Sequence, residues 1–127
     1  MIPAASRYSQ SQRETASPER LMVLLFQAAL KNIRTGAALL TSGQTTEGAR
    51  ALLKASEIVV ELHATLDRPR APQLCDQLAD VYRFVCNRLN AAALSRNVRA
   101  AHEAERVFSP IAEAFEAAVA SLQQQAR

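Results

Sequence analysis

Apolar residues recur at three- and four-residue intervals along four stretches of the chain, which is the spacing of one buried face on an α-helix. These stretches cover about Pro18–Leu40, Thr45–Leu66, Gln73–Leu94 and Asn97–Leu122. No stretch shows the strict alternation of apolar and polar residues that predicts a β-strand. The pattern therefore predicts an all-α fold.

Polar and turn-forming residues mark the expected helix ends. Ser17 stands before a proline, and its side chain can accept a hydrogen bond from a free amide at the start of the first helix. Ser42 and Gly43 predict the end of that helix, because glycine tolerates the left-handed conformation that commonly closes one. Either Thr45 or Thr46 is expected to cap the second helix, and either Ser95 or Asn97 is expected to restart the chain at the fourth.

Prolines divide the second half of the chain. The segment Asp67–Pro72 contains two prolines and two arginines and is the clearest break. Pro110 lies inside the apolar pattern of the fourth helix, which leaves two outcomes open. Either the helix kinks at this proline, or Ser109 caps a short extra C-terminal helix that follows it.

Short connections constrain how four such helices can pack. Loops of this length cannot cross the length of a bundle, so each helix should run antiparallel to the one before it. We expect an antiparallel, up-and-down four-helix bundle in one domain, residues 17–127. Residues 1–16 are polar with little to bury, and they predict a flexible N-terminal arm.

Composition narrows the classes of partner. The 127 residues are 49% apolar and carry a net charge of +3, but the basic residues are scattered singly from Arg7 to Arg127. Nucleic-acid binding needs several cations on one face, so we expect no nucleic-acid partner. No apolar run approaches the roughly 20 residues of a membrane span, which predicts a cytoplasmic protein without membrane insertion.

Catalytic and metal-binding patterns are missing from the sequence. Cys75 and Cys86 would lie about 16 Å apart on one helix, too far for a disulfide, and no close pair of metal ligands occurs. We expect no enzyme activity, no metal and no cofactor. One alternative stays open, a histidine phosphotransfer-like signalling bundle using His63, although Asp67 would place an acid near the incoming phosphoryl group.

The chain carries more apolar surface than one core requires. Six consecutive apolar residues, Leu21–Phe26, cover the whole circumference of the first helix, and further apolar residues lie beside the core stripes of the second and third helices. They predict outer grooves that receive amphipathic helices of a partner. The candidate groove residues are Tyr8, Leu21, Leu25, Leu53, Val60, Ala64, Tyr82, Cys86 and Leu89, with Tyr8 folding over the empty groove.

Several groups of residues, in order along the chain, resemble FliS-type flagellar chaperones. They are Glu14–Met22 with Leu25, Phe26 and Ala29; Leu53–Ala55 with Ile58, Val59, Leu62, Leu66 and Asp67; and Leu78, Val81, Tyr82, Arg88 and Leu89, followed by Ala114 and Phe115. The resemblance covers about residues 8 to 122. It departs from the family at Arg68–Pro72, where glycines are usual, and in lacking a tryptophan after Ala114.

The resemblance implies an export chaperone. Such a protein holds the disordered C-terminal region of flagellin in a 1:1 complex, prevents premature polymerisation and supports delivery to the flagellar type III export apparatus. A component of the export gate is a further partner that the resemblance suggests. Whether the bundle also self-associates stays open at this stage.

Overall fold

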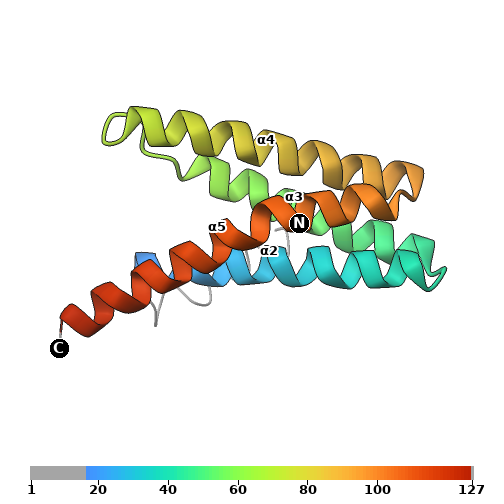
Figure 1. The fold of residues 1–127 in the computed structure, drawn as a ribbon, viewed down its shortest axis with the longest axis horizontal. Coiled ribbons are helices and arrows are strands. Elements are labelled where there is room, and N and C mark those ends of the chain that lie inside the picture. The colour runs from blue at the N-terminus through green and yellow to red at the C-terminus, as the bar shows by residue number, and fades with distance from the viewer. Residues whose placement is uncertain (1–16, 127) are drawn as a thin grey trace, which may run out of the picture.

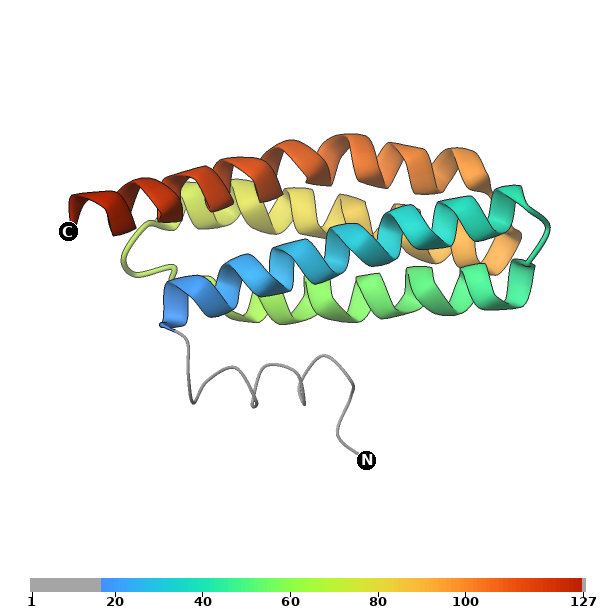
Figure 2. The ribbon, with the colours of Figure 1, turned by 90° about the horizontal axis from the view of Figure 1, so that it is seen from below.

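Four long helices make up the computed structural model, which describes residues 17–126 (Figure 1). They are α2 (Pro18–Thr41), α3 (Thr45–Ala64), α4 (Pro72–Ser95) and α5 (Val98–Gln125). Successive helices run in opposite directions, as Figures 1 and 2 show from two sides. The expected all-α, up-and-down four-helix bundle is confirmed. The expected N-terminal arm lies outside the described residues.

The helices pack in a ring. Each helix contacts its neighbours in the chain, and α5 returns to pack against α2. The core therefore receives one face from every helix. Its largest fully buried side chains are Phe108, Ile33, Leu52, Ile58, Leu62, Leu89, Val23, Val59 and Val85.

Two of the expected helix starts are confirmed by their hydrogen bonds. The amide of Arg20 donates to Ser17 Oγ at 3.2 Å, and the amide of Ala100 donates to Asn97 Oδ1 at 3.2 Å. Each bond satisfies an amide that lacks a partner within its helix. Asn97 caps α5 because Arg96 before it adopts a left-handed conformation, with φ of 53°.

The expected threonine cap of the second helix is wrong. Gln44 precedes α3 without a side-chain capping bond, while Thr45 and Thr46 already lie in the first helical turn. Gly43 adopts φ of +84°, which turns the chain so sharply that α3 begins directly after Gln44. A residue with helical backbone angles cannot serve as the N-cap.

The short extra helix after Pro110 does not form. Instead, α5 continues through this proline to Gln125, and Figure 1 shows a change of direction about halfway along it. Ser109 cannot act as a cap, because its hydroxyl donates to Glu113 Oε1 at 3.1 Å and accepts from Arg34. Pro110 is exposed, so water can reach the carbonyl that has lost its amide partner.

The two ends of the bundle differ. We call the end with the Ser42–Gln44 and Arg96–Asn97 connections the turn end, and the end with residues 65–71 the loop end. At the loop end, the last turns of α5 extend beyond the other helices (Figure 2). Leu122 in this extension is 58% exposed, although Val119 one turn earlier is buried.

Candidate functional site

A row of exposed apolar side chains lies on α3. Leu53 is 41% exposed, Val60 is 58% exposed and Ala64 is also exposed. Their spacings of seven and four residues place them on one side of the helix. Exposed apolar residues in a row, rather than singly, are typical of a surface that binds a partner.

Helix α4 forms the other wall beside this row. Cys86 is half-buried, and its Sγ donates to the carbonyl oxygen of Ser56 on α3 at 3.8 Å. Since Ser56 lies between Leu53 and Val60 in sequence, Cys86 reaches α3 midway along the exposed row. We call the surface formed by Leu53, Val60, Ala64 and Cys86 the α3–α4 groove.

Two hollows accompany this surface. One, of about 500 Å³, lies on the turn-end half of α3 and is lined by Thr46, Ala49, Arg50, Leu53, Lys54 and Glu57. The other, of about 470 Å³, is at the loop end, and its mainly apolar walls come from α2, α4, α5 and the loop. Its larger lining residues are Met22, Phe26, Leu66, Leu74, Leu78, Tyr82, Ile111 and Phe115.

Three expected groove residues are in the core instead. Leu25, Tyr82 and Leu89 are buried, with exposed fractions of 6%, 3% and 0%. Each lies on a helix that packs against two neighbours, so its buried face is wider than the single stripe read from the sequence. Of these three, only Tyr82 also lines the loop-end hollow. Leu21 is half-buried, and Tyr8 lies outside the described residues.

Helix α2 buries its run of six apolar residues more completely than the sequence predicts. Of the six residues Leu21–Phe26, three are buried and three are half-buried, and none is classed as exposed. Phe26 packs against Phe108 and Phe115 of α5, with ring centroids 5.7 and 5.0 Å apart. Aromatic pairs at these separations stabilise the contact between α2 and α5.

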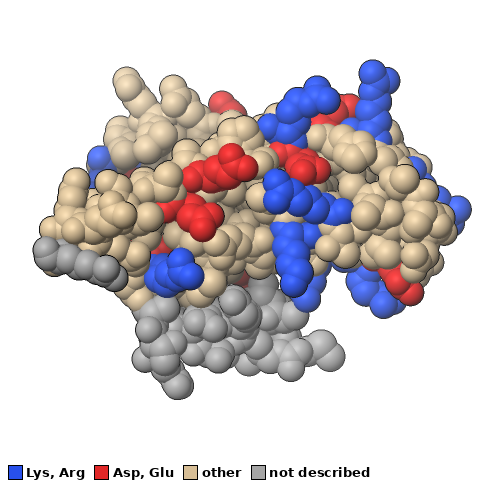
Figure 3. Space-filling model, turned by 60° about the horizontal axis from the view of Figure 1, so that its bottom comes forward, with Lys and Arg blue, Asp and Glu red and all other residues tan. Residues whose placement is uncertain are grey.

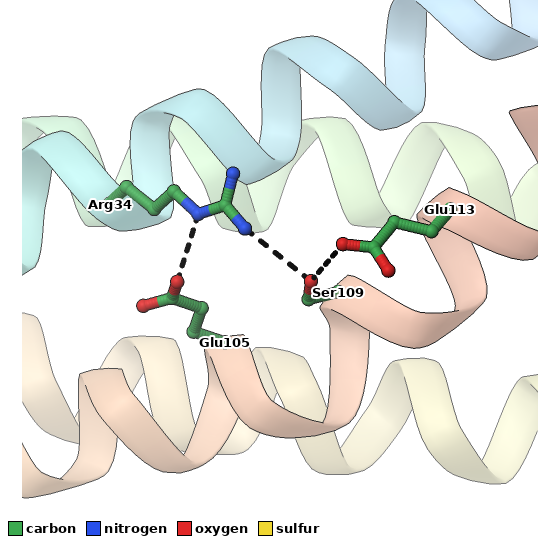
Figure 4. Close-up of polar contacts among 4 residues, drawn as sticks. All are labelled: Arg34, Glu105, Ser109 and Glu113. Atoms are coloured by element: carbon green, nitrogen blue, oxygen red, sulfur yellow. Dashed lines mark hydrogen bonds and ion pairs between the residues drawn. The ribbon is translucent and has the colours of Figure 1, made fainter.

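Polar contacts close the outer side of the α2–α5 contact (Figure 4). Arg34 Nε donates to Glu105 Oε2 at 2.9 Å, and its Nη2 donates to Ser109 Oγ at 3.4 Å. Further along, Gln27 Nε2 donates to Glu116 Oε1 at 2.9 Å. Glu105, which interrupts the apolar stripe of the fourth helix, thus pairs across to α2.

Burial shifts the pKa of two groups of α4, Tyr82 and Cys86, in favour of their neutral forms. It raises the pKa of Tyr82 to about 12, and it raises the pKa of Cys86, an effect that the hydrogen bond to Ser56 partly offsets. His63 is exposed in the last turn of α3 and approaches Tyr82 edge-on, with ring centroids 6.4 Å apart. Among residues 17–126, no three His, Cys, Asp or Glu side chains could together hold a metal ion.

Some exposed apolar residues were not expected from the sequence. By its helical spacing Leu74 lies on the buried face of α4, yet it is 55% exposed because it lies in the first turn of the helix at the open loop end. Phe84 and Leu94 are also exposed. Helical spacing places Leu94 outside the buried face of α4 and so predicts its exposure, whereas Leu74 lies on the buried face and its exposure is not predicted.

Charged residues are segregated along the bundle axis. Dividing each helix near its middle, the turn half comprises residues 30–55 and 84–109, and the loop half comprises the remaining described residues. The turn half contains Lys31, Arg34, Arg50, Lys54, Arg88, Arg96, Arg99 and Arg106 against Glu47, Glu103 and Glu105. The loop half contains Glu19, Glu57, Glu61, Asp67, Asp76, Asp80, Glu113 and Glu116 against Arg20, Arg68, Arg70 and Arg83.

The resulting net charges are +5 for the turn half and −4 for the loop half. Figure 3 shows one face on which Lys and Arg gather toward the turn end, at the right, while the larger acidic patch lies nearer the middle and left. The scattered positions in the sequence hide this segregation, because antiparallel helices bring distant segments to the same end. The bundle therefore carries an electrostatic polarity along its length.

Comparison with known proteins gives consistent results. The sequence model of the family described as "Flagellar protein FliS" matches residues 1–122. The flagellar secretion chaperone FliS of Salmonella typhimurium strain LT2 is 31% identical over 102 residues, which cover 80% of this chain and 76% of that protein. The protein of the same name from Bacillus subtilis strain 168 is 27% identical over 114 residues, covering 90% and 84%.

A solved structure shares the fold. The "Crystal structure of flagellar chaperone from bacteria" superimposes with a TM-score of 0.72 at 20% sequence identity, covering 93% of this chain and 96% of that one. At this identity the likeness concerns the arrangement of the helices. Among the described helices, none is both long and apolar enough to cross a bilayer.

Proposed function

The chain belongs to the FliS family of flagellar secretion chaperones, and on this premise we propose that it binds the disordered C-terminal region of flagellin along the α3–α4 groove. The observation that carries the proposal is the exposed row Leu53, Val60 and Ala64, at the spacing that an amphipathic partner helix requires. The turn-end hollow includes Leu53 of this row, and the mainly apolar loop-end hollow offers a second surface between α2, α4, α5 and the 65–71 connection.

An exposed apolar surface suits the task of covering the helices of an unpolymerised subunit. A subunit that polymerises through amphipathic helices exposes their apolar faces while it is still a monomer, and those faces must be covered until export. A helical bundle can cover them by burying apolar area, without chemical reaction or bound nucleotide. We infer a 1:1 complex formed in the cytoplasm, because one groove presents one row of anchoring positions.

Release is part of the same proposal. Ordering a disordered segment costs about 2–5 kcal/mol of the gross interaction energy, which keeps the net affinity below what the buried area alone would give. The complex can therefore dissociate when the export apparatus takes the subunit. We propose that a component of the export gate contacts the loaded complex.

The phosphotransfer alternative receives no support. The chain matches a family of secretion chaperones along nearly its whole length. Its candidate residue His63 stands edge-on to the Tyr82 ring at the end of α3. Helix-end histidines interact favourably with the helix dipole, which accounts for this position without a phosphoryl-transfer role.

Isothermal titration calorimetry of the full chain with a peptide of the flagellin C-terminal region tests the proposal. We expect binding with a negative heat-capacity change, the sign of buried apolar surface. Val60→Ser should weaken the affinity about fivefold, since roughly 1 kcal/mol of apolar burial is lost. Leu122→Ser is the matched control, because Leu122 is equally exposed at 58% but lies near the end of α5, which packs against α2 and α4.

Two results would contradict the proposal. One is the absence of binding at high micromolar concentration of the peptide. The other is an equal loss of affinity in the Val60 and Leu122 variants, which would mean that binding depends on general surface hydrophobicity.

A further inference from the structure

The separation of basic and acidic residues between the two ends of the bundle is also present along the proposed binding surface. On the turn-end part of α3, Arg50 and Lys54 are exposed and line the hollow beside Leu53. Toward the loop end, Asp76 and Asp80 are exposed on α4, whereas Glu57 lines the turn-end hollow together with Arg50 and Lys54. A partner segment lying along α3 therefore meets basic residues at one end and predominantly acidic residues at the other.

The charges at the two ends of the groove act on a bound segment separately, because the groove is longer than the distance over which salt screens a charge. Leu53 and Ala64 are 11 residues apart, which corresponds to about 16 Å along a helix. The Debye length at physiological ionic strength is about 8 Å, so a charge near Leu53 is largely screened from one near Ala64. Each half of a bound segment thus responds mainly to its own end of the bundle.

The ion pairs of the loop half do not cancel this polarity. Asp76 pairs with Arg68 and Asp80 pairs with Arg83, but both pairs are on the surface. The part of the loop half that borders the groove, residues 56–83 of α3, the connection and α4, has five acidic and three basic residues and thus a net charge of −2. At the turn half, Arg34 pairs with Glu105 and Arg88 with Glu103, and the net charge is still +5.

We propose that this charge polarity gives the bound segment a single direction, with its acidic half at the turn end and its basic half at the loop end. The inference rests on the proposed binding of an amphipathic segment in the α3–α4 groove. It adds the chemistry of the partner: apolar anchors at three- and four-residue spacing, with acidic and basic residues segregated into opposite halves. Apolar anchors alone give affinity in either direction, whereas the charges distinguish the two directions.

Two synthetic peptides of about 20 residues test the inference, since a helix of that length spans the bundle. Both carry leucines at identical positions; one has glutamates in its first half and lysines in its second, and the other has the reverse order. A nitroxide at the N-terminus of each peptide broadens nearby backbone signals in the NMR spectrum of the full-length chain. The spectra are compared at low and high salt.

We expect the glutamate-first peptide to broaden signals around Thr45 and Thr46, and the lysine-first peptide to broaden signals around Ala64. The preference for one direction should be about tenfold at low salt, the factor that corresponds to a modest electrostatic difference. It should fall to about twofold at 1 M salt, where the Debye length is about 3 Å. Broadening at the same end by both peptides, or equally at both ends, would overturn the inference.

Charge-reversal variants supply the matched comparison. Arg50→Glu combined with Lys54→Glu should reduce the directional preference to about twofold, because the basic end of the groove is lost. Arg99→Glu combined with Arg106→Glu changes charge equally on α5, which packs against α2 and α4, and should leave the preference near its original value. An equal effect of the two double variants would contradict a role for the groove charges.

The outcome separates this inference from the proposed function. If the flagellin peptide binds but the synthetic peptides bind without direction, only the inference fails. If neither the flagellin peptide nor a synthetic peptide binds, the groove itself is refuted and the inference falls with it.

Sedimentation of the chain alone provides a further check. Self-association at low salt that disappears at high salt would assign the charged ends to a second copy of the chain and overturn the inference.

Discussion

Gly36 of α2 and Leu52 of α3 lie so close that a Cβ atom on the glycine would stand 2.5 Å from Leu52 Cγ. Leu52 is fully buried and cannot move away without disturbing the core. A Cβ atom on Gly48 of α3 would likewise stand 3.0 Å from the backbone nitrogen of Leu40. These two glycines let α2 and α3 pack backbone to backbone in the turn half.

Gly36→Ala should therefore destabilise the protein. Alanine favours a helix over glycine by about 1 kcal/mol, but overpacking a core costs about 1–3 kcal/mol, and here the clash involves a fully buried side chain. We expect a net loss of about 1 kcal/mol in the free energy of unfolding, measured by urea denaturation. Thr35→Ala, at an exposed neighbouring position, is the control and should cost nothing. Higher stability of the Gly36 variant would contradict the close approach.

The ion pair between Arg34 and Glu105 should contribute little to stability. The Arg34 side chain is 52% exposed, and exposed pairs contribute about 0.2–1 kcal/mol. We predict that a double-mutant cycle with Arg34→Met and Glu105→Gln gives a coupling free energy within that range, decreasing as salt is added. Coupling above about 2 kcal/mol would show that the pair behaves as a buried one.

Tyr82 should make stability depend on pH in the alkaline range. Burial raises the pKa of its phenol to about 12 from the ordinary value of 10.0. The unfolded chain thus releases the proton first, so the stabilising effect is fully present below pH 10 and is lost as the pH rises toward 12. In a Tyr8→Phe background, absorbance of the phenolate should rise near pH 12 in the folded protein. A midpoint near 10 with the fold intact would refute the burial of Tyr82.

Cys86 should react slowly with alkylating reagents. Burial raises the pKa of its thiol, so less of the reactive thiolate is present than in an unfolded chain at the same pH. In a Cys75→Ala background, which leaves Cys86 as the only thiol, we expect the iodoacetamide reaction to accelerate on addition of denaturant. Occupancy of the α3–α4 groove should slow it further. A folded-state rate equal to that of the unfolded chain would argue against this environment.

The number, order and direction of the helices were predictable because each is set by local patterns. Ser17 and Asn97 cap helices as their side-chain chemistry suggests, and Asp67–Pro72 holds the break between α3 and α4. Pro110 shows the limit of local reasoning. A proline disfavours a helix interior, but the tertiary contacts of α5 on both sides of it keep the helix continuous.

The proposed binding surface was only partly predictable. Leu53, Val60 and Ala64 are exposed as expected, whereas Leu25, Tyr82 and Leu89 are buried. Sequence periodicity identifies the centre of a buried face, but the width of that face depends on where the neighbouring helices lie. The same reason accounts for the charge polarity, which emerges only when the antiparallel arrangement brings Arg50 and Arg96 to one end.

Backbone NMR of the full-length chain, titrated with the C-terminal region of flagellin, tests the central claim most directly. If the α3–α4 groove receives this segment, the largest chemical-shift changes will cluster around Leu53, Val60, Ala64 and Cys86. Signals along the outer α2–α5 contact, such as those of Arg34 and Glu105, will change little. Changes concentrated at α2 and α5, with the groove residues unaffected, would contradict the account.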